Sequence, residues 1–245
     1  MNLAAQVPSL DALRRYAIAR SLFKPTSLPA AIRRLGFVQA DPMRAPARAQ
    51  DLILRLRVNG YRAGDLERRY TRLPIDEDCF VNYGFVPRDT LALLHPRAPR
   101  QSWDANTRAR AADLLAFVSE RGASHPKDVQ AAFAHHGRAV SAWGSDLRAT
   151  TLLLDDMHYR GLLRVQRRDS GTRVFEVVQH PEQDHSPAGA QARADALLDL
   201  IVRLYAPLPA ASLGYLAGLL RYGAPQLVAE TRQAVLSAKS RYAHA

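Results

Sequence analysis

The chain has 245 residues, of which 47% are hydrophobic and 23% are charged, and its formal net charge at pH 7 is +11. This length and composition suit a folded protein of one to three small domains. No apolar run approaches the roughly 18 residues that span a bilayer, and the first residues lack the features of a signal peptide, so we expect a cytoplasmic protein without a membrane partner. The single cysteine, Cys79, excludes an internal disulfide framework and a thiolate-rich metal site.

The positive charge is concentrated in the first part of the chain. Residues 1–110 hold 19 Lys and Arg against 10 Asp and Glu, whereas the remaining 135 residues hold 15 against 13. Such an imbalance predicts a polyanionic partner. Arginine makes up 31 of the 34 cations, which fits forked contacts to phosphate and equally fits the codon usage of a GC-rich genome.

Residues 1–98 are expected to form a first unit. Ser9 and Ser27 are suitable caps for two short helices, which end before Pro25 and at Gly36. An extended segment then leads to Asp41. The stretch from 76 to 86 is acidic and then aromatic, and its aromatic residues Phe80, Tyr83 and Phe85 are expected to lie in the core. The remaining expected helices are an amphipathic basic one from 48 to 58 and a short one that starts at residue 65. The proline-rich stretch 95–100 marks the end of this unit.

The pattern of residues 99–180 predicts a second unit with three helices, over 107–121, 124–136 and 142–159, followed by a hairpin of strands 162–168 and 172–177. Ser124 is the expected cap of the second helix. Three helices followed by a hairpin are typical of a winged helix. The hairpin tip carries Arg167, Arg168 and Arg173, which are expected to touch DNA phosphates or enter a minor groove. The alternative is an ordinary solvated hairpin.

Residues 181–245 predict a third, incomplete helical unit. A polar linker over 181–188 precedes helices over 190–205 and 213–220 and one that starts at Pro225, without a hairpin after them. The expected fold class is therefore mainly α with small β-hairpins, built from tandem winged-helix (helix-turn-helix) units.

Gln39 and Asp41 are the candidate catalytic residues. They stand two positions apart in an extended segment, which places both side chains on one side. Asp41 precedes a proline, so a plain turn is the alternative. Arg44, Arg48 and Arg55 follow and are candidate phosphate ligands. The eight histidines lack metal-ligand spacing, and no phosphate-loop, dinucleotide or serine-hydrolase motif occurs, so we expect no metal and no cofactor.

The segments Leu35–Asp41, Arg48–Arg57 and Gly60-Tyr61 resemble the corresponding part of the AlkZ/YcaQ-type bacterial DNA glycosylases. That family carries a Gln-x-Gln or Gln-x-Asp motif, tandem winged helices and a C-terminal β-barrel, and we expect this sequence to lack the barrel. At Gln50-Asp51 the chain departs from the His-rich stretch of many members.

The resemblance implies DNA repair by a monofunctional glycosylase that removes N7-alkylated, bulky or crosslinked purines from double-stranded DNA. It implies that Asp41 acts as base or electrostatic stabiliser, that Gln39 positions water or sugar, and that the protein is a monomer. The alternative is a non-enzymatic winged-helix protein such as a transcription regulator. It would read bases from the start of the helix expected over 142–159, with Ser141, Ser145, Asp146 and Arg148.

Overall fold

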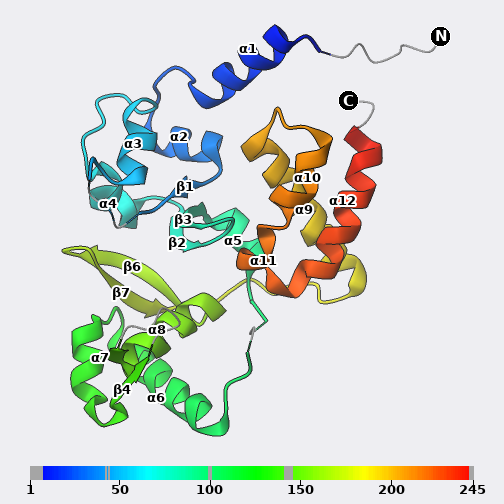
Figure 1. Cartoon of the computed structure of the whole chain (residues 1–245). Coiled ribbons are helices and arrows are strands. Elements are labelled where there is room, and N and C mark those ends of the chain that lie inside the picture. Colours follow the sequence, from blue (N-terminus) through cyan, green and yellow to red (C-terminus); the bar gives the residue numbers. More distant parts are fainter. Residues whose placement is uncertain (1–7, 42, 44, 99–100, 141–145, 243–245) are drawn as a thin grey trace.

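The computed structural model describes residues 8–41, 43, 45–98, 101–140 and 146–242. They form a mainly helical fold with small antiparallel sheets and, within these residues, no closed barrel (Figure 1). The helices are α1 (Leu10–Ser21), α2 (Leu28–Leu35), α3 (Ala49–Arg55), α4 (Asp65–Arg69), α5 (Arg88–Leu94), α6 (Ala105–Arg121), α7 (Pro126–Ala132), α8 (Ala149–Arg160), α9 (Pro187–Tyr205), α10 (Ala210–Ala217), α11 (Leu220–Gly223) and α12 (Val228–Tyr242). The strands are β1 (Val38–Gln39), β2 (Ile75–Cys79), β3 (Tyr83–Pro87), β4 (Arg138–Val140), β5 (Asp146–Arg148), β6 (Leu163–Asp169) and β7 (Thr172–Val177).

The first two helices begin at the predicted serine caps. The Ser9 hydroxyl accepts from the Ala12 N–H, and the Ser27 hydroxyl accepts from the Ala30 N–H. Gly36 ends α2 with a φ of 73°, which is the left-handed region that favours glycine. Strand β1 therefore begins only two residues after Gly36.

The first sheet has the order β1-β3-β2, and all its pairs are antiparallel. The sequence predicts core aromatics here, and the β2–β3 hairpin is not among the predicted elements. Strand β2 reads Ile-Asp-Glu-Asp-Cys, and acidic residues are poor strand formers. Phe80 and Phe85 are buried as predicted, whereas Tyr83 is only half-buried. The acidic residues Asp76, Glu77 and Asp78 are buried as well, which requires partners supplied from other parts of the chain.

Helix α3 is shorter than the predicted 48–58 helix. It ends at Arg55 because the chain turns there to place Val58 in a bridge with Thr26. The guanidinium of Arg57 then donates to the carbonyl oxygens of Ile53 and Ser21, each at 2.6 Å. These contacts fix α3 against the end of α1.

The second unit has the predicted order α6, α7, α8, β6, β7, with two corrections. Ser124 does not cap α7, since it pairs with Phe175 of β7, and the His125 ring accepts from the Lys127 N–H instead. The third helix begins at Ala149 rather than 142, because residues 146–148 form β5. In consequence Asp146 and Arg148 lie in a strand, and Ser141 and Ser145 lie outside the described residues. The β6–β7 turn carries positive φ at Ser170 and Gly171, as a tight hairpin requires.

The third unit packs on the first. Leu197 and Ile201 of α9 lie in one buried cluster with Phe80 and Leu94, so this helix rests against the β2–β3 hairpin and α5 (Figure 1). Within the described residues no single helix has the length and apolarity to cross a membrane. Helix α9 and the α10–α11 segment pass that test only as a pair bent by 120°.

Candidate functional site

A cleft of about 1210 Å³ lies between the first and second units. The first unit forms one wall, and the β6–β7 hairpin forms the other together with residues of α7 and α8. Figure 1 shows the hairpin lying beside the first sheet and reaching toward α4, so that residues far apart in sequence face one another. Five of the eight predicted site residues line this cleft: Gln39, Asp41, Arg48, Arg168 and Arg173.

Gln39 and Asp41 reach the cleft because the segment keeps its extended alternation. Val38 is buried and Ala40 packs against the same core, so the residues between and after them face the other way. The ladder with β3 continues one residue beyond β1, through the Ala40 N–H donating to the Tyr83 carbonyl at 3.1 Å. Gln39 and Asp41 therefore both line the cleft, at the edge of a small sheet.

Asp41 is held by two hydrogen bonds. Its Oδ1 accepts from the Met43 N–H at 2.8 Å, and its own backbone N–H donates to Oε1 of Gln50 at 3.2 Å. The first bond is a local turn of the kind that Asp-Pro sequences favour, but the side chain does not cap a helix. Asp41 thus presents a carboxylate at the cleft wall.

The cleft arginines are all paired with carboxylates. Arg48 forms an ion pair with Glu67 of α4. Arg173 of β7 contacts Asp155 of α8 at 2.7 Å. The pairing lowers the net positive charge of the cleft, and it fixes each guanidinium in one place.

Arg168 of β6 makes the most enclosed of these pairs. It donates two bonds, at 2.7 and 2.5 Å, to the carboxylate of Glu77, which is 1% exposed. Burial opposes the charge of Arg168, but the hydrogen bonds and charge of Glu77 outweigh this and raise its pKa. Burial and the same glutamate raise the pKa of Tyr83, whose hydroxyl donates to Glu77 at 3.1 Å, so this phenol stays neutral at the cleft wall.

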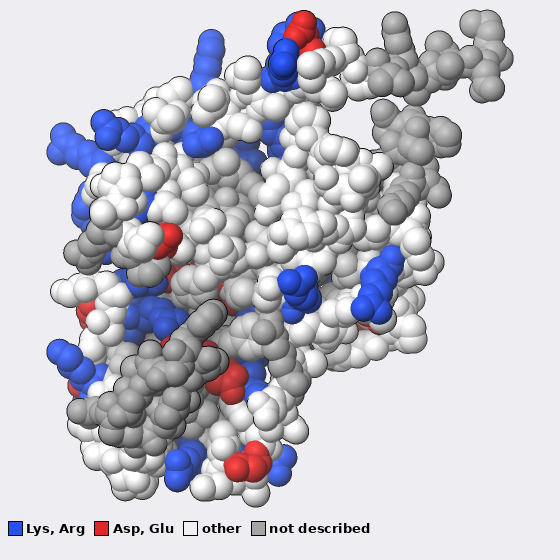
Figure 2. Space-filling view, viewed as in Figure 1, with Lys and Arg blue, Asp and Glu red and all other residues white. Residues whose placement is uncertain are grey.

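Two of the predicted DNA ligands, Arg55 and Arg167, do not line the cleft. Arg55 is exposed on α3 and does not line the cleft. Arg167 pairs with Asp169 beside the hairpin turn, at 3.0 Å. Arg44 lies outside the described residues. Figure 2 shows basic side chains spread over this face of the first unit, with a further group at the level between that unit and the second.

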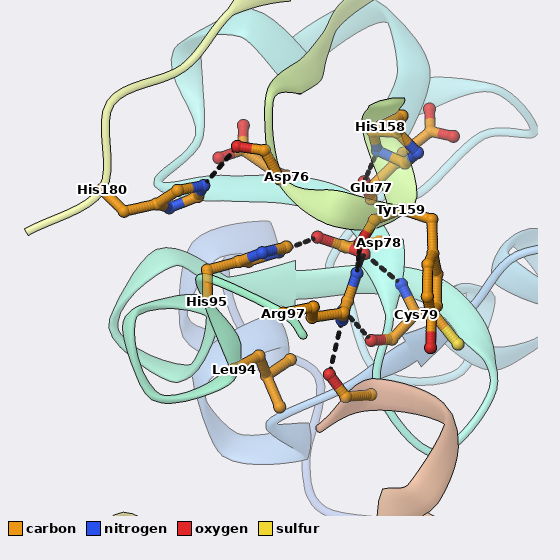
Figure 3. A network of polar contacts seen from close by, with 12 residues as sticks. Asp76, Glu77, Asp78, Cys79, Leu94, His95, Arg97, His158, Tyr159 and His180 are labelled. Carbon is orange, nitrogen blue, oxygen red and sulfur yellow. Dashed lines mark hydrogen bonds and ion pairs between the residues drawn. The ribbon is translucent and has the colours of Figure 1, made fainter. Parts of the chain in front are cut away.

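A buried network behind the cleft joins all three units (Figure 3). Asp78 accepts from the His95 ring at 2.6 Å and from Arg97 at 2.8 Å. Arg97 also donates to the carbonyl oxygens of Cys79, Tyr159 and Gly223, at 2.5 to 2.7 Å. The predicted boundary at 95–100 thus contains side chains that fasten the units together.

The charge states in this network follow from its burial. Burial opposes ionisation of Asp78, but Arg97 and the hydrogen bond from His95 outweigh it and hold the pKa of Asp78 below its usual range. Burial lowers the pKa of His95 to about 4 in spite of the adjacent carboxylate. His95 is therefore a neutral ring that donates from Nε2, and it stacks on His180 at 4.4 Å between ring centroids.

We expect the fold to weaken in mild acid because of His95. In the unfolded chain His95 takes up a proton near pH 6.5, whereas in the folded chain it does so only near pH 4. Between these pH values the unfolded state therefore binds more protons, and the free energy of unfolding falls as the pH falls. Between pH 8 and pH 5 His95 should lower the free energy of unfolding by about 2 kcal/mol. Urea unfolding at both pH values measures it.

His95→Gln should reduce that pH dependence by about the same amount, whereas the same change at exposed His185 should leave it intact. His158 is also buried and has a lowered pKa, but it is present in both variants. The difference between the variants therefore reports His95 alone. An unchanged pH dependence in His95→Gln would show that His95 is not the group responsible.

No metal site is built from the described residues, because no three of their His, Cys, Asp and Glu side chains lie close enough together.

The comparisons with known proteins fit this arrangement. Residues 32–241 match the family model described as DNA glycosylase AlkZ-like. The chain belongs to the AlkZ-like family of DNA glycosylases. The resemblance seen in the sequence is thus confirmed.

The fold is also similar to that of Streptomyces sahachiroi DNA glycosylase AlkZ, with a TM-score of 0.54 at 14% sequence identity. The match covers 91% of this chain and 62% of that chain. At this identity the likeness concerns the fold alone. A search among curated proteins finds no match.

Several cleft residues of this AlkZ-like chain were not predicted, namely Gln50, Glu67, Tyr83 and Asp155, together with Glu77 behind them. For Glu77 the sequence does hold a signal, since Asp76, Glu77 and Asp78 are three consecutive acidic residues in the basic part of the chain. Their distant partners are Arg164 and Arg168 of the second unit and His95 and Arg97 of the proline-rich stretch 95–100, which no local pattern indicates.

Proposed function

We propose that this chain is a monofunctional DNA glycosylase that hydrolyses the N-glycosidic bond of N7-alkylated purines, bulky or crosslinked ones included, in double-stranded DNA. The observation that carries the proposal is the position of Gln39 and Asp41, side by side in a cleft whose other wall is an arginine-bearing hairpin. The order of α6, α7, α8 and the hairpin supports a winged helix in the second unit, and α2–α4 with β2–β3 support a related first unit.

The proposed chemistry needs few groups. Alkylation at N7 makes the purine a cationic leaving group, so protonation of the base is unnecessary. The enzyme has to stabilise the positive charge that develops on the sugar and to supply water. Asp41 does both in this proposal, as a carboxylate beside C1′ and as the base that takes the proton from water. Gln39, whose carboxamide has an NH2 group that donates and a carbonyl oxygen that accepts, orients the water or the sugar.

The proposed DNA contacts use the remaining donor positions of paired arginines. A guanidinium has five N–H groups, so Arg48, Arg168 and Arg173 retain donors for phosphate after meeting their carboxylates. Being fixed in place, they lose little side-chain entropy on binding. Arg55 and Arg167 are proposed to contact phosphates outside the cleft, and Arg44 is proposed to contact a phosphate as well.

Arg55→Ala should weaken DNA binding in a salt-dependent manner. One lost phosphate contact lowers the slope of log affinity against log salt concentration by about 0.9. Fluorescence anisotropy with a labelled duplex at several salt concentrations measures the slope. Arg14→Ala, on α1 and paired with exposed Asp11, is the matched control, and equal slopes for both variants would remove Arg55 from the interface.

The proposal is tested with a duplex that carries one N7-methylguanine. The purified protein should release the modified base and leave an abasic site, which alkali converts into a strand break at that position. An undamaged duplex of the same sequence should stay intact. Absence of cleavage above the spontaneous background would refute glycosylase activity on this class of lesion.

In the transcription-regulator alternative, two of the four base-reading residues, Asp146 and Arg148, do not lie on the reading helix. The residues it required at the start of the 142–159 segment lie in β5 or outside the described residues, and α8 begins only at Ala149. In the same binding assays, tight binding to one undamaged sequence would still favour it over a glycosylase.

A further inference from the structure

Gln50 connects the backbone of Asp41 to the helical part of the first unit. We propose that Gln50 is a positioning residue, which acts on the reaction by holding the Asp41 carboxylate at the cleft wall. The inference rests on the proposed function. The geometry that carries it is the hydrogen bond from the Asp41 N–H to Gln50 Oε1 at 3.2 Å.

Asp41 needs such an anchor because it lies just beyond the sheet. The β1–β3 ladder ends with the Ala40 N–H donating to Tyr83. The next residue after Asp41 is a proline, which has no N–H to donate. The bond from the Met43 N–H to Asp41 Oδ1 is internal to the turn. Among the described hydrogen bonds, the one to Gln50 is the only one that ties Asp41 to another element.

Gln50 is itself rigidly placed. It is 4% exposed and lies in the first turn of α3, whose Leu54 is fully buried. The start of this helix is fixed by the ion pair of Arg48 with Glu67 of α4. A continuous path therefore runs from α4 through Arg48 and α3 to Gln50, and from there to Asp41.

The orientation of the Gln50 carboxamide follows from its partner. A backbone N–H can only donate, so the group that meets Asp41 must be the oxygen. A buried glutamine in this orientation provides an acceptor that a hydrocarbon side chain cannot replace. Loss of the acceptor frees the Asp41 backbone, and a shift of about 1 Å in a reacting group can cost about 100-fold in rate.

The test compares Gln50→Met, which keeps length without the carbonyl, with Gln50→Glu, which keeps an acceptor oxygen. Single-turnover excision of N7-methylguanine should fall about 10- to 100-fold in the methionine variant. Affinity for a duplex with a tetrahydrofuran abasic-site analogue should change less than about threefold. The glutamate variant should recover most of the lost rate. Gln183→Met, where the glutamine amide binds the Ala92 carbonyl, is the matched control and should excise normally.

Hydrogen exchange at the Asp41 amide provides a readout that does not depend on catalysis. The amide should exchange faster in Gln50→Met than in the wild type. If exchange is unchanged, or if methionine and glutamate variants excise equally slowly, the positioning role is wrong. If the wild type excises nothing while Gln50→Met still speeds exchange at Asp41, the anchor holds and the proposed glycosylase function fails.

Discussion

Replacing Asp41 by asparagine is expected to slow single-turnover excision of N7-methylguanine by about 10²–10⁴-fold, the usual contribution of a general base. The amide keeps the size of the side chain and can still accept from the Met43 N–H, so the turn and the cleft wall should persist. What is lost is the negative charge that faces the developing cation and the group that accepts a proton from water. Affinity for undamaged duplex should stay the same or rise slightly, because one negative charge is removed.

Asp128→Asn is the charge-matched control for this experiment. Asp128 is exposed in the first turn of α7 and does not line the cleft. It therefore removes the same charge from the same side of the molecule without touching the proposed site. Equal excision rates for Asp41→Asn and the wild type would show that the carboxylate has no part in the reaction.

Replacing Arg97 by methionine is expected to lower the free energy of unfolding by about 3–5 kcal/mol, as when one partner of a buried ion pair is removed. The Arg97 side chain is fully buried, and its loss leaves the Asp78 carboxylate without its main compensating charge. Three carbonyl oxygens, one of them in each unit, also lose their donor. Urea unfolding followed by circular dichroism measures the effect.

Arg88→Met provides the comparison at an accessible ion pair. Arg88 contacts Asp76 at 3.3 Å with a side chain that is 49% exposed, so its removal should cost less than about 1 kcal/mol. A loss for Arg97→Met that is no larger than this would mean that the network does not fasten the units together.

Local patterns were sufficient for the parts of the fold that local chemistry determines. The serine caps at Ser9 and Ser27, the glycine stop at Gly36 and the β6–β7 hairpin are all found. The alternation that brings Gln39 and Asp41 into one cleft belongs to the same class, since it depends only on an extended backbone. These features lie within a few residues of the signal that predicts them.

The features that were missed depend on contacts between distant residues. Strand β2 has an unfavourable composition, and its burial is compensated by Arg168, 91 positions away, and by Arg164, 88 positions away. The same holds for Ser124, which suits a helix cap by sequence but pairs with Phe175 in the structure. The prolines around Arg97 indicate a connection between units, and nothing in the sequence shows that Arg97 is buried between them.

The central claim is that the damaged nucleotide lies in the cleft between the first unit and the hairpin. It is tested most directly by photo-crosslinking to a duplex with a diazirine at an abasic-site analogue, followed by mapping of the crosslinked peptides. The account predicts crosslinks within residues 39–50 and 168–175. Crosslinks confined to the third unit, residues 187–242, would contradict it.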